Sequence, residues 1–205
     1  MLKSQIESFY KKQDNPNRLC QGDIIKNFSF SQSIKKDSLI EIKTITFPYI
    51  VILSQDCDLM QFFDNNNKKA DGIFNQYLQN VLFAPAFLRA DIEKGEHLLL
   101  FNIKQTVKTK KEIAKIIDLK EERYHYLQEN MNLLLPELFI DFKIYYSMEP
   151  HRIFEIYSNN YIATINELFR ERLTQRYANY ISRIGTPDLN RNIGIDFLLS
   201  NQAEN

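Results

Sequence analysis

The sequence predicts an α+β protein, in which an antiparallel sheet, strongly bent or closed into a barrel, is followed by a long C-terminal helix. Three observations predict this class. Up to about residue 158 the chain consists mostly of short segments in which apolar and polar residues alternate. An apolar, β-branched run at 49–53 is typical of a buried central strand. Residues 161–184 repeat apolar side chains every three or four positions, which is typical of a helix.

The individual elements follow from the same periodicities. Strands are expected at 21–30, 38–47, 49–53, 79–87, 123–127, 138–146 and 151–157. Pro48 cannot donate a ladder hydrogen bond, so it indicates a strand boundary or a sheet edge. Helical patterns are expected at 1–12, 88–95, 108–122 and 161–184. A further apolar segment lies at 97–103, and a polar loop is expected at 64–72.

We expect one domain over residues 1–205. Its barrel core would cover about 20–158, its C-terminal helix about 161–185 and its tail 188–205. The chain has 205 residues, of which 44% are hydrophobic and 25% charged. That composition is typical of a globular protein with a sizeable core, and it argues against disordered, collagen-like and disulfide-rich classes.

Charge and cysteine content restrict the function classes. The 26 basic side chains balance 26 acidic ones, so attraction to a polyanion would need a local patch. Two cysteines are too few for a disulfide framework and fit cytosolic thiols. The first twelve residues lack the apolar region of a signal peptide, and the apolar runs are too short to span a membrane. We therefore predict a cytoplasmic protein without a membrane partner.

The segment Ser54-Gln55-Asp56-Cys57-Asp58 directly follows the predicted central strand. In one interpretation Cys57 is a catalytic thiol, with Asp56 and Asp58 beside it and His125 or His151 as the base. The flanking carboxylates oppose this interpretation because nearby negative charge raises a thiol pKa. In the second, Cys57 is a small buried core residue and Asp56 or Ser54 caps the following turn. In the third, the segment is a binding loop.

Metal and cofactor sites are not predicted. The potential ligands show neither a C-x-x-C nor an H-E-x-x-H spacing, and the three histidines, His97, His125 and His151, are scattered. With five glycines in total, a phosphate-cradling loop is not expected either. We predict no cofactor and no metal.

Two basic groups could bind nucleic acid or a protein partner. The first is a lysine patch in which five lysines oppose Glu112, namely Lys104, Lys108, Lys110, Lys111 and Lys115. The second consists of Arg172, Arg176 and Arg183, which lie within roughly 40° of one another on a helix. Such groups can neutralise phosphates, but they are equally typical of solvated helix faces. Six tyrosines in the second half of the chain suit either an interface or half-buried strands, namely Tyr145, Tyr146, Tyr157, Tyr161, Tyr177 and Tyr180.

Two stretches between Gln21 and Leu59 resemble the PemK/MazF-type barrel proteins. Gly22-Asp23-Ile24 matches their opening motif, and 47–54 matches their central strand segment R-P-x-V-V-L-S. The resemblance implies an SH3-like barrel and, in active members, metal-independent RNA cleavage by an arginine before the proline and a later Thr or Ser. Here Phe47 occupies the arginine position, and 82–87 offers no Thr or Ser, so the catalytic pair is missing.

The chain is also similar to a set of uncharacterised bacterial proteins over most of residues 21–187. The shared motifs are Q-G-D-I, V-x-L-S-Q-x-C-D-L, R-Y-x-Y-L, D-F and a late helix that ends R-[IV]-G-x-P, which lie here at 21–24, 51–59, 123–127, 141–142 and 183–187. Such proteins resemble accessory genes beside defence or toxin-like modules, an association that carries no known activity.

The leading hypothesis is a binding or accessory component of a bacterial phage-defence or toxin–antitoxin-like system. It would act through contacts with a protein encoded nearby, and formation of a homo-oligomer is left as an open alternative. Alternatives are a ribonuclease or hydrolase that uses Asp56-Cys57-Asp58 with a histidine, and an RNA- or DNA-binding module.

Overall fold

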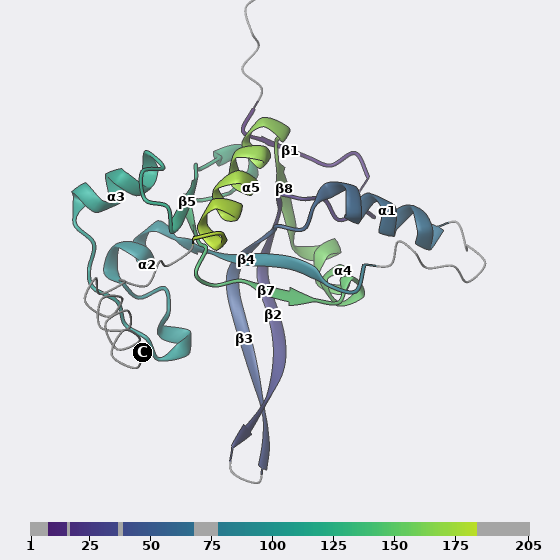
Figure 1. The fold of residues 1–205 in the computed structure, drawn as a ribbon, viewed down its shortest axis with the longest axis horizontal. Coiled ribbons are helices and arrows are strands. Elements are labelled where there is room, and N and C mark those ends of the chain that lie inside the picture. Colours follow the sequence, from purple (N-terminus) through teal and green to yellow (C-terminus); the bar gives the residue numbers. More distant parts are fainter. Residues whose placement is uncertain (1–7, 16, 37–38, 68–77, 184–205) are drawn as a thin grey trace, which may run out of the picture.

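The computed structural model describes residues 8–15, 17–36, 39–67 and 78–183. The sequence-predicted class is confirmed: helices accompany an antiparallel sheet that curls through 211° as a half-barrel, and a helix follows near the C-terminus (Figure 1). The strands are β1 Tyr10–Lys11, β2 Asp23–Lys36, β3 Leu39–Ile52, β4 Val81–Leu88, β5 Tyr124–Leu127, β6 Leu138–Asp141, β7 Tyr146–Met148 and β8 Tyr161–Ile165. The helices are α1 Asp56–Asn67, α2 Arg89–Lys94, α3 Lys110–Ile117, α4 Pro150–Asn160 and α5 Glu167–Ile181, with short 3-10 turns η1 Leu99–Phe101 and η2 Met131–Leu133.

The strands form one sheet in the order β1-β8-β2-β3-β4-β6-β5, and β7 pairs with β4 beside β6. One edge of β4 pairs with β3, and its other edge pairs first with β7 and then with β6. The segment predicted as one strand at 138–146 is therefore two strands. They are separated by a turn in which the Ile144 amide donates to the Asp141 carbonyl, at 3.0 Å, and the Lys143 amide to the Asp141 carboxylate, at 3.1 Å.

Two apolar clusters hold the sheet between the helices. Neighbouring residues of β3 separate into them, because Ile50 and Ile52 belong to the first cluster while Val51 belongs to the second. The first cluster includes residues of α1 to α4, and the second includes Leu173 and Tyr177 of α5. Side chains that alternate along a strand thus bury both faces of the sheet, which explains the wholly apolar run at 49–53.

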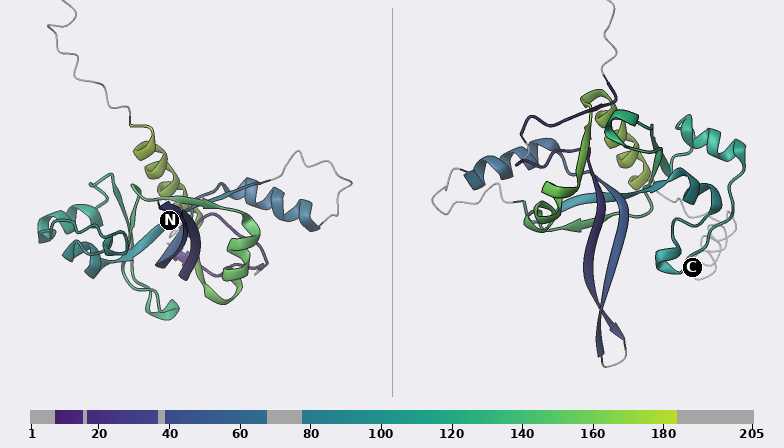
Figure 2. Two further views of the ribbon diagram at one scale, coloured as in Figure 1. Left: turned by 90° about the horizontal axis from the view of Figure 1, so that it is seen from below. Right: turned by 180° about the vertical axis from the view of Figure 1, so that it is seen from behind.

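Strands β2 and β3 continue far beyond the rest of the sheet as a two-stranded ribbon (Figures 1 and 2). The predicted boundary at Pro48 is wrong, since β3 runs through it. Pro48 lies where the ladder skips a pair, opposite Asn27, whose φ is +50°. Pro48 has no amide hydrogen to donate, and because the ladder is broken at this point, no ladder hydrogen bond is lost. The break also lets Ile25 and Phe28 face the same core.

Three other predictions are corrected. Tyr10–Lys11 is an edge strand paired with β8 instead of part of a helix, and 1–7 lie outside the described residues. The segment predicted as a strand at 151–157 is in α4, which starts with Pro150 at its first turn and buries Ile153 and Tyr157 four residues apart. Residues 161–165 form β8, so the last helix begins only at Glu167. Asn166 is its N-cap, and the Asn166 side chain accepts a hydrogen bond from the Glu167 amide.

The remaining elements match their prediction more closely. Helix α2 ends at Gly95, and α3 lies within the predicted lysine-rich helix. The predicted stop signals Gly185 and Pro187 and the tail 188–205 lie outside the described residues. The polar loop predicted at 64–72 is wrong for 64–67, which are the last turn of α1, and 68–72 lie outside the described residues. No described helix is long and apolar enough to cross a membrane.

Candidate functional site

The two sequence motifs Q-G-D-I and S-Q-D-C-D meet at one end of the sheet. The Gln21 amide donates to Asp56 Oδ1 at 3.2 Å, and the Gln21 side chain donates to the Leu53 carbonyl at 2.9 Å. The Gly22 amide donates to the Ile52 carbonyl at 2.8 Å. These bonds join the start of β2 to the end of β3 and the first turn of α1. The proximity of the motifs is thus a result of β2–β3 pairing.

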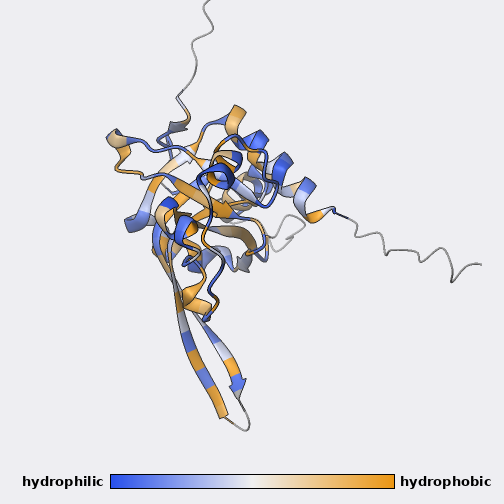
Figure 3. Ribbon diagram, turned by 90° about the vertical axis from the view of Figure 1, so that its left-hand side faces the viewer, coloured by the Kyte–Doolittle hydropathy of each residue, from blue (hydrophilic) through white to orange (hydrophobic). Residues whose placement is uncertain are grey.

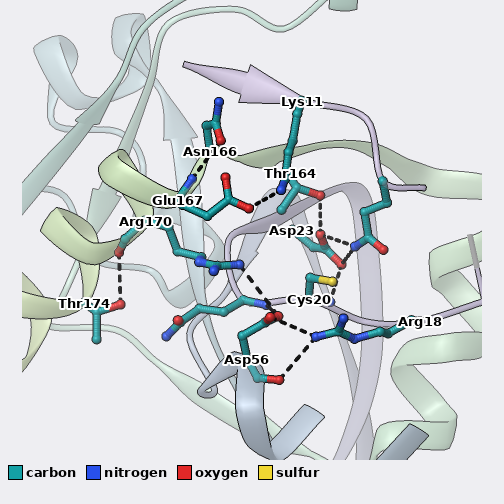
Figure 4. A network of polar contacts seen from close by, with 12 residues as sticks. Lys11, Arg18, Cys20, Asp23, Asp56, Thr164, Asn166, Glu167, Arg170 and Thr174 are labelled. Carbon is teal, nitrogen blue, oxygen red and sulfur yellow. Dashed lines mark hydrogen bonds and ion pairs between the residues drawn. The ribbon is translucent and has the colours of Figure 1, made fainter. Parts of the chain in front are cut away.

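Asp23 is a fully buried carboxylate at the centre of this region (Figure 4). It accepts hydrogen bonds from Gln13 Nε2 at 2.5 and 2.6 Å, from the Cys20 amide at 2.7 Å and from Thr164 Oγ1 at 2.6 Å. Burial nevertheless raises the pKa of Asp23 to about 6, because desolvation outweighs the hydrogen bonds from Thr164, Cys20 and Gln13 that lower it. Asp23 therefore ties β2 to β8 and to the N-terminal segment.

Asp56, in the first turn of α1, is the second carboxylate of the region. Its side chain lies 2.8 Å from Arg18 Nη2 and 3.7 Å from Arg170 Nη1, as Figure 4 shows. A cavity of about 190 Å³ opens beside these groups, and Lys11 and Glu167 at its wall form an ion pair with each other. Asp56 and Glu167 at the cavity wall each pair with a cationic side chain. These ion pairs hold α1 and α5 against the sheet.

Cys57 lies on α1 next to Asp56, but its side chain is exposed. The interpretation of Cys57 as a small buried core residue is therefore wrong. Its sulfur lies 3.6 Å from Gln55 Oε1 and 3.7 Å from Asp58 Oδ1, and no hydrogen bond or ion pair joins it to a histidine within the described residues. Cys20 is the thiol that lines the cavity, and burial, reinforced by Asp23 and Asp56, raises its pKa to about 12. A thiol with that pKa is protonated at neutral pH and is a weak nucleophile.

The two predicted base candidates lie in different places. His151 is exposed at the start of α4, with its ring centroid 5.8 Å from that of Phe62, and both line an apolar cavity of about 340 Å³. His125 is buried in β5, where its ring packs near Phe142. Burial, together with Arg176 and Arg172, lowers the pKa of His125 to about 3. The structure thus brings together His125 and two predicted arginines, but not the cysteine and the predicted base.

The predicted basic residues divide into exposed and structural side chains. Lys104 and the α3 lysines Lys110, Lys111 and Lys115 are exposed, while Lys108 lies 5.1 Å from the ring centroid of Tyr124. Arg176 donates to the carbonyls of Leu119, Glu121 and Tyr124 at 2.7, 2.7 and 2.8 Å, so it fixes the α3–β5 connection to α5. Arg183 pairs with Glu122. Arg172 forms no ion pair within the described residues.

Of the six tyrosines, Tyr157 and Tyr177 are buried, Tyr146, Tyr161 and Tyr180 are half-buried, and Tyr145 is exposed. Tyr146 packs with Phe30, Phe47 and Phe83 at centroid distances of 5.2, 5.4 and 5.9 Å. Sheet and core packing therefore account for most of this set.

Sequence reasoning missed an ionic group around the buried Asp141, at the end of β6. Arg123 donates to both carboxylate oxygens of Asp141 at 2.8 and 2.5 Å, and His97 Nε2 lies 3.5 Å from Asp141 Oδ2. The signal was available in the R-Y and D-F motifs, but their pairing depends on the β5–β6 register. No group of three or more potential ligands among the described residues is arranged to hold a metal ion.

Comparisons of the chain with protein-family models, with curated proteins and with solved structures return no match. The function is therefore argued below from the residues and their surroundings.

Proposed function

We propose that the chain is a binding component that acts through protein–protein contacts made by its projecting ribbon. We define the arm as residues 31–36 and 39–44, the outer part of β2 and β3. The observation that carries the proposal is the exposure of large apolar side chains on this arm: Leu39, Ile40 and Ile42 are 71%, 73% and 76% exposed. Isolated exposed apolar residues are ordinary, but a group of them on a projecting element is typical of an interaction site.

Backbone geometry gives the arm a second binding property. β8 pairs with β2 only at Asp23–Ile25, and β4 pairs with β3 only at Tyr49–Ile52. In the described part of the chain the outer edges of both arm strands are therefore unpaired. An open edge accepts an added strand from a partner, whose main-chain bonds provide affinity while alternate side chains provide specificity.

The charge of the arm indicates the chemistry of that partner. Among the arm side chains that the structure describes, Lys35 and Lys43 stand against a single acid, Glu41. Apolar and polar side chains alternate over 40–43 of β3, whereas Ile34 is the one apolar residue in the β2 part of the arm; Figure 3 shows these apolar bands among polar ones. We infer that the partner supplies an extended segment in which apolar residues alternate with acidic ones, because such a strand complements both the isoleucines and the lysines.

The biological setting remains part of the proposal. The Q-G-D-I and S-Q-x-C-D motifs resemble those of bacterial accessory proteins, which supports a cytoplasmic role in a phage-defence or toxin–antitoxin-like system. Phe47, where the barrel nucleases have an arginine, supports a binding role over family-type RNA cleavage.

The test uses the purified full chain and each protein encoded beside its gene. We expect one of these proteins to bind in a titration and the double variant Ile40→Thr/Ile42→Thr to weaken that binding at least about tenfold, because burying the two exposed isoleucines against the partner would contribute a few kcal/mol. Threonine keeps the β-branched shape that a strand favours.

The matched control is Leu168→Gln, which removes an exposed apolar side chain from α5. It should leave the affinity unchanged. The proposal fails if no neighbouring gene product binds, if the arm variant binds as tightly as the wild type, or if duplex RNA or DNA takes the place of the protein on the arm.

A further inference from the structure

A cavity of about 220 Å³ lies where α5, the end of α3 and β5 converge, away from the arm. Its lining includes Phe9, Leu119, His125, Gln128, Phe169 and Arg172. Phe9 and Phe169 form an aromatic wall, since their ring centroids are 4.2 Å apart and tilted by 31°. The cavity thus combines an apolar wall with three nitrogen-bearing side chains.

His125 supplies an unsatisfied polar group to this cavity. Its side chain is 2% exposed, and its Nδ1 atom is buried without a hydrogen-bond partner among the described residues. A buried, unpaired ring nitrogen destabilises the protein unless something satisfies it. Because its pKa is lowered, the imidazole is neutral at pH 7, so one ring nitrogen can donate a hydrogen bond and the other can accept one.

Arg172 supplies an unpaired cation to the same cavity. On the same helix Arg170 lies against Asp56, Arg176 donates to three backbone carbonyls, and the neighbouring Arg183 pairs with Glu122. Among described residues Arg172 has no such acceptor, and its guanidinium lies near enough to His125 to lower the pKa of that imidazole. A planar guanidinium without a partner fits a carboxylate in two-point geometry.

We propose that this cavity binds a small organic carboxylate with a flat apolar body. The carboxylate lies against Arg172 and receives a hydrogen bond from the neutral His125 ring, while the apolar body packs on Phe9 and Phe169. This inference is independent of the proposed arm function, because it concerns different residues on a different surface. It gives a chemical role to two side chains that the packing of the fold leaves without acceptors.

Benzoate is the probe that tests the proposal, with benzamide as the neutral molecule of the same shape. Full-length protein labelled with ¹⁵N is titrated with each. We expect benzoate to shift the ring nitrogens of His125 and the amide of Phe169, and to bind at least about tenfold more tightly than benzamide, since a charged hydrogen bond is lost in the amide.

Arg172→Gln should lower the benzoate affinity about tenfold and leave the melting temperature unchanged, because the side chain is exposed and unpaired. Arg152→Gln, on the exposed face of α4, is the control and should bind benzoate as the wild type does. His125→Gln should also weaken binding, and its fold is checked by the same amide spectrum.

Three outcomes would overturn the assignment. Equal affinity for benzoate and benzamide would remove the role of charge, and an unaffected Arg172→Gln would place the carboxylate elsewhere. Inorganic phosphate that bound as tightly as benzoate would show that the apolar wall takes no part.

Discussion

At the residue scale, Asp23 shows how a polar group can be necessary and costly at once. Its carboxylate has four hydrogen bonds, yet its pKa is raised to about 6 because no water surrounds it. In the unfolded chain an aspartate titrates near pH ~4. The native state therefore binds a proton more tightly than the unfolded state between these two pH values.

The stability contribution of Asp23 has a definite sign. The stabilisation by Asp23 is fully present below about pH 4. It is lost as the pH rises through about 6, and the total loss is about 3 kcal/mol. Glu112, Glu137, Asp141 and Glu167 have lowered pKa values and act in the opposite sense, losing stability as the pH falls. Because these carboxylates titrate in any variant of the protein, the contribution of Asp23 is isolated by comparing an Asp23 variant with the wild type.

We predict that the difference in unfolding free energy between the wild type and Asp23→Asn shrinks by about 3 kcal/mol from pH 4 to pH 7.5, because only the wild type ionises there. Urea denaturation at several pH values measures it. Thr164→Val removes a hydrogen bond that lowers the pKa of Asp23. In that variant the pH-dependent loss of stability should therefore occur at higher pH than in the wild type. A difference independent of pH would contradict the buried, partly protonated carboxylate.

At the element scale, two glycines with positive φ lie at the ends of elements, Gly22 directly before β2 and Gly95 directly after α2. Gly95, with φ of +70°, ends α2, and its amide donates to the Ile92 carbonyl at 3.2 Å. A Cβ there would lie 2.3 Å from the Gln105 carbonyl oxygen and 2.7 Å from its carbon. Gly22, with φ of +84°, has more room, since its Cβ would lie 3.1 Å from Ile165 Cβ.

Gly95→Ala should therefore destabilise the protein more than Gly22→Ala. Both substitutions pay the left-handed backbone penalty of about 1–2 kcal/mol, but only Gly95→Ala also displaces neighbouring backbone, which cannot rotate away as a side chain can. Thermal unfolding of both variants ranks them. Equal losses, or a greater loss at Gly22, would show that the backbone contact between Gly95 and Gln105 is not as tight as its geometry indicates.

The elements also show why sequence patterns succeed or fail. A lysine-rich amphipathic pattern predicts α3 because Ile113 and Ile116 fit only a helical face. The segment 151–157 fails because Ile153 and Tyr157, four apart, share a face in either a strand or a helix. Pro150, favoured in the first turn of a helix, is the signal that separates the two. The β-branched segment 161–165 likewise belongs to a strand, and Asn166 is the cap that marks the true start of α5.

The candidate site was predictable in part. The sequence places Asp56 and Cys57 after the central strand, and α1 begins there. It could not indicate that Asp23 bonds to Thr164, 141 residues later, or that His125 lies beside Arg172, since both depend on which strands and helices pack together. Burial decided the rest: Cys57 is exposed while Cys20, which shows no motif of its own, is the thiol at the cavity.

At the scale of the whole molecule, aromatic side chains fill the core on one face of the curled sheet. Phe47 is fully buried, and its ring lies 6.0 Å from Phe30, 6.3 Å from Phe87 and 6.3 Å from Phe101, centroid to centroid. It thus joins β2, β3, β4 and η1 in one cluster. Position 47, which the proposed resemblance to the barrel nucleases matches to their arginine, is here a core position.

Phe47→Ala should therefore lower the unfolding free energy by about 3–5 kcal/mol, through lost burial and the cavity left among rings that cannot all collapse. Phe47→Arg should be worse, because it buries a charge without a partner, and we expect it to be insoluble instead of gaining nuclease activity. Ile42→Ala, an equally apolar truncation on the arm, should cost less than about 0.5 kcal/mol because Ile42 is exposed. Urea denaturation of the three variants measures the contrast. A folded Phe47→Arg variant with wild-type stability would mean that the face around Phe47 is open to solvent and could hold a site, which would reverse the assignment of this face as core.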